Sequence, residues 1–167
     1  MPRIAVVDDQ PDMRQQLCSM IDQYSHENNC MLEVTTFSDG SQVITNYGKG
    51  FDIIFLDIEM PELGGMDAAE RIRTVDPDVV LVFVTNMAQY AIRGYEVDAL
   101  DFVLKPVNYY QFSTKLARAL QRVQRRKGWG RAAAEHRGHL LAGNAGPYAA
   151  LPYLHRGMVR AFQPAKC

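Results

Sequence analysis

Carboxylates, a hydroxyl and a lysine stand at the ends of apolar runs in this sequence. Asp8 and Asp9 follow the first run, Asp57 the third, Thr85 ends the fourth and Lys105 follows the last. Three closely spaced carboxylates repel one another unless a divalent cation neutralises them, and a ligand set made only of oxygen favours Mg²⁺ over zinc or copper. Together with Lys105 and Thr85, such a metal could hold a phosphoryl group, because the two cations balance its charge and the hydroxyl donates a hydrogen bond. A carboxylate at the centre could accept that group as an acyl phosphate.

Each of these residues also has a purely structural explanation. Asp8 and Asp9 could cap the helix that follows them, which is common for Asp after a strand. Asp57 could be a loop residue before Met60-Pro61, and Lys105-Pro106 could form an ordinary exposed turn. It is hard to assign to chance that all of these residues stand at the ends of successive strands. We therefore favour the chemical interpretation.

Five β-rich runs must position these side chains. Residues are apolar in succession within the third and fourth runs, which indicates strands buried on both faces of a sheet. The second run alternates and includes Glu33, as is typical of an edge strand. The predicted strands are Arg3–Val7, Met31–Phe37, Phe51–Asp57, Val79–Thr85 and Leu100–Leu104.

Five amphipathic segments separate or follow the strands. The last carries Phe112, Leu116, Leu120 and Val123 on one stripe, at the spacing of a helix. The predicted helices are Pro11–Tyr24, Gly40–Tyr47, Met66–Val75, Ala88–Tyr95 and Tyr109–Arg126. Because strands and helices alternate and parallel crossovers are right-handed, we expect an α/β fold with a doubly wound, flavodoxin-like parallel sheet of order 2-1-3-4-5.

Composition supports one globular domain with a tail. The chain has 167 residues, of which 47% are hydrophobic and 22% charged. No apolar run reaches the roughly 20 residues of a membrane-spanning helix, and the N-terminus lacks a secretory signal, so we expect a cytoplasmic protein without membrane contact. Three cysteines without a paired spacing suggest neither a disulfide framework nor a zinc site.

The chain changes character near Gly128. Residues 1–127 carry 13 Lys and Arg against 18 Asp and Glu, whereas residues 128–167 carry 5 against 1. The last forty residues are rich in Ala, Gly, Arg and Pro and contain a single β-branched residue, Val159. We therefore predict an irregular, basic tail after the α/β domain. The basic run Arg122 to Lys127 is read as a solvated helix face.

The motifs that carry the candidate residues resemble those of the receiver domain of bacterial two-component response regulators. They are Val7-Asp8-Asp9, Phe55-Leu56-Asp57-Ile58-Glu59-Met60-Pro61 followed by Gly64-Gly65, Val84-Thr85, and Phe102-Val103-Leu104-Lys105-Pro106. The resemblance covers about residues 1–126, and its motifs are highly specific in combination.

The resemblance implies a role for each residue of the site. Asp57 would accept a phosphoryl group from a phosphohistidine of a sensor histidine kinase. Asp9, Asp57 and the backbone carbonyl of Glu59 would bind Mg²⁺ directly, and Asp8 would act largely through water. The receiver would catalyse only its own phosphorylation and dephosphorylation, and would not be an enzyme in the usual sense.

A switch is implied as well. Thr85 and Phe102 would form the switch pair, and Lys105 would pair with the phosphoryl group. The change would reach the face made by the fourth helix, the fifth strand and the fifth helix, through which a homodimer could form. Phosphorylation would thus alter a binding surface.

Residues 90–102 resemble the LytTR subgroup, whose receivers precede a β-rich DNA-binding domain. That resemblance implies a regulator of transcription, with DNA as a partner only where an output domain is present. A domain of that kind needs roughly a hundred β-rich residues, which residues 127–167 do not supply. We interpret residues 1–126 as the receiver and 127–167 as a tail, either natural or the remnant of a frameshifted or truncated DNA-binding region.

Three other functions compete with a phosphorylated transcription regulator. A stand-alone receiver would act through protein contacts alone. An Mg²⁺-dependent phosphohydrolase with an Asp nucleophile would show Asp-x-Asp after a strand, but here Asp57-Ile58-Glu59 leads directly into Met60-Pro61. A receiver-like docking module would typically have lost an acidic residue, the acceptor or the lysine, and all of these are present.

Overall fold

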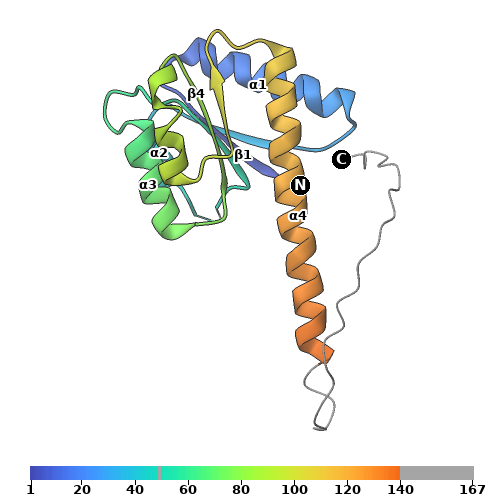
Figure 1. Ribbon diagram of the computed structural model, residues 1–167. Helices are drawn as coiled ribbons and strands as arrows, with labels where there is room; N and C mark the ends of the chain where they lie inside the picture. The colour runs from blue at the N-terminus through green and yellow to red at the C-terminus, as the bar shows by residue number, and fades with distance from the viewer. Residues whose placement is uncertain (49, 140–167) are drawn as a thin grey trace.

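The computed structural model describes residues 1–48 and 50–139, and its centre is a parallel β-sheet (Figure 1). The strands are β1 (Arg3–Val7), β2 (Glu33–Phe37), β3 (Ile53–Leu56), β4 (Val80–Thr85) and β5 (Asp101–Leu104). Their order is β2-β1-β3-β4-β5, and every neighbouring pair is parallel. The predicted flavodoxin-like topology is confirmed.

Helices cover both faces of the sheet. They are α1 (Pro11–Glu27), α2 (Gly40–Thr45), α3 (Gly65–Val75), α4 (Tyr109–His139) and the short 3₁₀ helices η1 (Ala88–Tyr90) and η2 (Arg93–Val97). One apolar cluster joins α1 and α4 to one face of the sheet, and a second joins α2, α3 and η2 to the other. Figure 1 shows this three-layer arrangement, with α1 and α4 on one side and α2 and α3 on the opposite side.

The predicted hydrophobic stripes are what attach the helices to the sheet. Phe112, Leu116, Leu120 and Val123 of α4 are all buried, as are Leu17, Ile21 and Tyr24 of α1. The ring of Phe112 lies 4.9 Å from that of Phe55 in β3, centroid to centroid. Burial of such apolar side chains is the main favourable contribution to the stability of this face.

The sheet is buried as its sequence predicts. Every residue of β3 and β4 is buried, because helices cover both of their faces. The edge strand β2 differs. Its residues Glu33, Thr35 and Thr36 are exposed, and Phe37 is its one buried residue.

The predicted fourth helix, Ala88–Tyr95, is wrong. The segment forms η1 and η2, in which backbone N–H groups donate three residues back, as from Tyr95 to Ile92. Asp98 then adopts a left-handed conformation with φ of 49°, which turns the chain into β5. Gly94 weakens any α-helix here, and the Arg73 side chain holds the carbonyls of Val97 and Asp98. Residues 1–48 and 50–139 therefore contain four α-helices instead of the five expected.

The last helix is longer than its prediction. α4 continues past Arg126 to His139, so the expectation of an irregular segment is wrong for residues 128–139. Extending a helix that is already nucleated costs far less than starting one, and the three alanines at 132–134 offset the weak propensity of Gly128 and Gly130. Residues 140–167 lie outside the described part of the chain.

Within the described residues, no helix combines the length and apolar character that crossing a membrane requires.

The contact between α4 and the sheet generates a prediction about stability. Phe112 is fully buried, so Phe112→Ala should lower the free energy of unfolding by about 3–5 kcal/mol in urea denaturation. Tyr110 lies on the same helix and is 81% exposed, so Tyr110→Ala should change it by less than about 0.5 kcal/mol. Equal losses in the two variants would contradict the assigned packing.

Candidate functional site

The candidate residues meet at the carboxyl edge of the sheet. Asp8 follows β1, Asp57 follows β3, Thr85 ends β4 and Lys105 follows β5. The sheet hydrogen bonding continues one residue past the strands, because the N–H of Asp57 donates to Val7 at 2.9 Å and that of Lys105 to Thr85 at 3.0 Å. Parallel pairing of adjacent strands therefore brings together side chains that are far apart in the sequence.

Lys105 lies between two buried carboxylates. Its Nζ is 2.8 Å from Asp8 Oδ2 and 3.0 Å from Asp57 Oδ2. The side chains of Lys105, Asp8 and Asp57 are 5%, 1% and 4% exposed. The ammonium group therefore neutralises part of the carboxylate charge in a place that water barely reaches.

Burial and charge act against each other on these groups. Burial raises the pKa of the Asp8 carboxyl above its ordinary value, and the contact with Lys105 offsets this only in part. Burial acts to lower the pKa of Lys105, but the contacts with Asp8 and Asp57 outweigh it, so its pKa lies above the ordinary value. Lys105 is consequently a cation throughout the neutral range.

Asp8, Asp9 and Asp57 form a group that suits a divalent cation. Each offers a carboxylate oxygen, and these oxygens lie within 4.8 Å of one another. Asp8 Oδ2 is buried and has no hydrogen-bond partner, since its contact with Lys105 lacks hydrogen-bond geometry. An all-oxygen donor set with an unsatisfied buried oxygen fits Mg²⁺. The predicted clustering of these three residues is confirmed.

The backbone of Glu59 is also close to Asp57. The N–H of Glu59 donates to Asp57 Oδ1 at 3.4 Å, while the Glu59 side chain is exposed. Gly65 lies against the same residue from the start of α3, where an added Cβ would come within 2.0 Å of the Asp57 carbonyl oxygen. No side chain fits at that position, so glycine allows α3 to begin directly beside Asp57.

Arg14 is a site residue that the sequence analysis missed. From the first turns of α1, its Nη1 donates to the carbonyls of Asp8 at 2.6 Å and Asp9 at 3.1 Å. The N–H of Gln10 donates to Asp8 Oδ1 at 2.9 Å. These bonds fix the loop that presents the acidic pair. The available signal was a basic residue about one helical turn after two adjacent carboxylates.

Asp39 holds the loop on the other side of the site. Its carboxylate caps α2 by accepting from Ser41 at 2.7 Å, and accepts from the backbone of Glu62 at 3.2 Å and Leu63 at 3.3 Å. Burial acts to raise the pKa of Asp39, but these hydrogen bonds outweigh it and the pKa is lowered. A charged Asp39 thus ties the start of α2 to the loop between β3 and α3.

Thr85 and Phe102 occupy neighbouring strands. Thr85 is fully buried, and its hydroxyl accepts from the N–H of Met87 at 3.2 Å. Phe102 is partly buried, with its ring 6.2 Å from that of Phe83. Next to it, Asp101 pairs with Lys115 at 2.6 Å and Arg118 at 2.9 Å.

Comparison with known proteins decides the family. The model of the response regulator receiver domain matches residues 4–117. This chain belongs to the response regulator receiver family. As a receiver it is not a conventional enzyme, and the phosphohydrolase alternative loses its support.

Curated relatives of this receiver include regulators of known class. It is 28% identical over 127 residues to the sensory transduction protein LytT of Oceanobacillus iheyensis, covering 74% of this chain and 50% of that protein. It is 29% identical over 127 residues to the transcriptional regulatory protein BtsR of Escherichia coli K12, covering 72% and 49%. This chain thus spans about half the length of the curated relatives it matches.

Solved receivers share its fold. The response regulator TrrA of Thermotoga maritima, solved with Mg²⁺ and a beryllium fluoride, is 28% identical with a TM-score of 0.63, covering 71% of this chain and 99% of that one. The response regulatory domain of mrkE from Klebsiella pneumoniae is 26% identical with a TM-score of 0.66, covering 74% and 98%.

The position of Arg14 generates a prediction about metal binding. Arg14→Met keeps an unbranched apolar side chain and removes the guanidinium donors, so the loop that carries Asp8 and Asp9 should loosen. We expect about tenfold weaker Mg²⁺ binding, followed through the amide NMR signals of Asp9 and Asp57. The control is Arg71→Met, which removes an exposed charge on α3. Unchanged affinity in Arg14→Met would show that the loop holds its shape without this side chain.

Proposed function

We propose that this receiver accepts a phosphoryl group on Asp57 from a phosphohistidine of a sensor histidine kinase, in an Mg²⁺-dependent reaction. The observation that carries the proposal is the position of the Asp57 carboxylate, which lies 3.0 Å from Lys105 Nζ and within the same carboxylate group as Asp8 and Asp9. In the reaction an Asp57 oxygen attacks phosphorus, the P–N bond breaks and the histidine nitrogen leaves.

Different residues have different parts in this reaction. Asp9, Asp57 and the carbonyl of Glu59 would bind the metal directly, and Asp8 would act largely through water. One observation supports a direct role for Asp9: among the described residues no hydrogen bond or ion pair engages its half-buried carboxylate, so both of its oxygens are available to the metal. Mg²⁺ bound there would neutralise charge on the transferred group. The complex of TrrA with Mg²⁺ and a beryllium fluoride supports this chemistry in a relative.

Lys105 and Thr85 complete the site and begin the switch. Once Asp57 carries the phosphoryl group, Lys105 would pair with that group, and the Thr85 hydroxyl would turn from Met87 toward it. The space that the hydroxyl leaves would admit the ring of Phe102, which lies on the neighbouring strand. A local charge change would in this way select between two side-chain arrangements.

The switch would be read on the face formed by η1, η2, β5 and α4. Exposed side chains there include Ile92, Tyr95, Leu104 and Tyr110. This face is our candidate for homodimer formation, and the ion pairs of Asp101 with Lys115 and Arg118 lie on it. Charged pairs beside exposed apolar side chains suit an interface with a defined register.

A role in transcription rests on the relatives. BtsR is a transcriptional regulatory protein, and the LytT and LytR matches point to the LytTR subgroup. Each aligns with this chain over about half of its own length, so DNA is a partner only where an output domain accompanies the receiver. We place the receiver at residues 1–126 and treat the basic segment 127–167 as a tail without sequence-specific DNA binding.

The phosphoacceptor assignment is tested with a small phosphodonor, Mg²⁺ and intact mass spectrometry. Wild type should gain one phosphoryl group, and Asp57→Asn should gain none because the amide cannot form the acyl phosphate. Asp67→Asn, which removes an exposed carboxylate of α3, is the control and should be labelled as wild type is. Labelling of Asp57→Asn at wild-type yield would place the acceptor elsewhere.

The division of roles between Asp8 and Asp9 makes a separate prediction. Asp9→Asn should weaken Mg²⁺ binding more than Asp8→Asn, by about tenfold between the two variants, because one removes a direct ligand and the other a water-mediated one. A calorimetric Mg²⁺ titration of both variants measures the order. The reverse order would exchange the two roles.

A further inference from the structure

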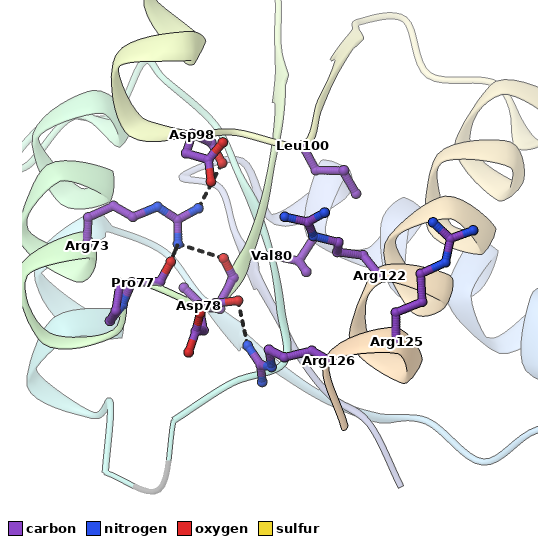
Figure 2. Close-up of a pocket in the computed structure, with 10 residues that line it drawn as sticks. Arg73, Pro77, Asp78, Val80, Asp98, Leu100, Arg122, Arg125 and Arg126 are labelled. Atoms are coloured by element: carbon purple, nitrogen blue, oxygen red, sulfur yellow. Dashed lines mark hydrogen bonds between the residues drawn. The ribbon is translucent and has the colours of Figure 1, made fainter. Parts of the chain in front are cut away.

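A pocket lies at the opposite end of the sheet from Asp57. Its floor is formed by Val79 and Val80 at the start of β4 and by Leu100 just before β5, and its volume is about 390 Å³. α3 and α4 supply its walls through Arg73, Arg122 and other basic side chains (Figure 2). None of the residues that hold the carboxylate site takes part in it.

Arg73 forms one wall of the pocket, and its guanidinium group is hydrogen-bonded to backbone carbonyls. Its guanidinium donates to the carbonyls of Val97 at 2.7 Å, Val79 at 2.6 Å, Asp98 at 3.0 Å and Pro77 at 3.2 Å. Figure 2 shows the side chain reaching from α3 toward Pro77 and Asp98. All of these acceptors are neutral, so the positive charge of Arg73 is held in place without a hydrogen-bonded carboxylate.

The basic run of α4 divides into two pairs. Arg126 and Lys127 contact the Asp52 carboxylate, at 3.5 Å and 3.1 Å, and Arg126 also donates to the Asp78 carbonyl. Arg122 and Arg125 are exposed, and no acidic partner for either exists among the described residues. Figure 2 shows Arg122 extending from α4 toward Val80 and Leu100. The expected solvated face therefore holds for Arg122 and Arg125, whereas Arg126 and Lys127 are tied to Asp52.

Charge and shape together specify a ligand class. Four arginines line the pocket against two aspartates, Asp78 and Asp98, so the lining is positive. Arginine forms paired hydrogen bonds with phosphate oxygens, and its planar group stacks on flat ring systems. A volume of about 390 Å³ with an apolar floor lies in the range of small-molecule sites. We propose that this pocket binds a phosphate ester of about mononucleotide size.

In this arrangement Arg122 and Arg125 bind the phosphate, and Val80 and Leu100 contact the organic part. Two unpaired guanidinium groups three residues apart on one helix can meet the same dianion, because residues at that spacing share a helix face. The proposal goes beyond phosphoryl transfer at Asp57, since it concerns reversible binding at the other edge of the sheet.

Adenosine 5′-monophosphate is a suitable probe, titrated into the full chain and followed by calorimetry and amide NMR. Wild type should bind it, with shifts concentrated at Val79, Val80 and Leu100. The double variant Arg122→Gln, Arg125→Gln should bind at least about tenfold more weakly, as expected for losing charged hydrogen bonds. Arg71→Gln, with an exposed arginine removed from α3, should stay within about twofold of wild type.

Two further ligands and one further variant complete the experiment. Adenosine lacks the charged phosphate group, and inorganic phosphate lacks the organic group that would contact Val80 and Leu100. Each should therefore bind more weakly than the ester. Asp57→Asn should bind the ester as wild type does, which separates this proposal from the phosphoacceptor proposal. Absence of binding at about 10 mM ester, equal binding of adenosine or inorganic phosphate, or equal loss in Arg71→Gln would each overturn the assignment.

Discussion

The contact of one buried ammonium group with two buried carboxylates is the constraint on which this domain's chemistry depends. Lys105 lies within 3.0 Å of both Asp8 and Asp57, at the point where the strands that carry them end. Unpaired charges in such a place would be very costly, so each of the three groups needs the others. One cation cannot balance all the carboxylates, because Asp9 adds a third. The site can therefore form without a metal, and its remaining negative charge still attracts a further cation.

The rest of the fold can be understood as the support for that contact. Parallel strands bring four chain segments to one edge, and two apolar layers pack the helices against the two faces of the sheet. Arg14 and Asp39 then fix the two loops that flank the carboxylates, each through backbone groups. Polar side chains that bind loop backbone replace the regular hydrogen bonding that loops lack. Precision at the site thus comes from residues that do no chemistry themselves.

Sequence patterns predicted the sheet order, the buried stripes of α1 and α4 and the clustering of Asp8, Asp9 and Asp57. Those features follow from periodicity and from the position of residues at strand ends, which are local properties. Arg14 was missed because its targets are carbonyl groups, which every residue has. The Ala88–Tyr95 helix was wrong; Gly94 weakens an α-helix there, and Arg73, distant in sequence, binds the carbonyls of Val97 and Asp98 just after the segment. The extension of α4 was missed because the low helix propensity of Gly128 and Gly130 was considered without the preceding helix, which already provides the nucleus.

The length of α4 has a mechanical consequence. Its 31 residues correspond to about 46 Å, of which the first turns pack beside β5 and the last extend beyond the sheet (Figure 1). The helix is held from Phe112 to Lys127, so its last 12 residues, about 18 Å, project beyond the final contact and amplify a rotation of the packed part. A tilt of about 5° would move the far end by about 1.6 Å over this length. Rearrangements smaller than a side chain at the edge that holds Asp57 would then be measurable as ångström-scale movements on the opposite side of the molecule.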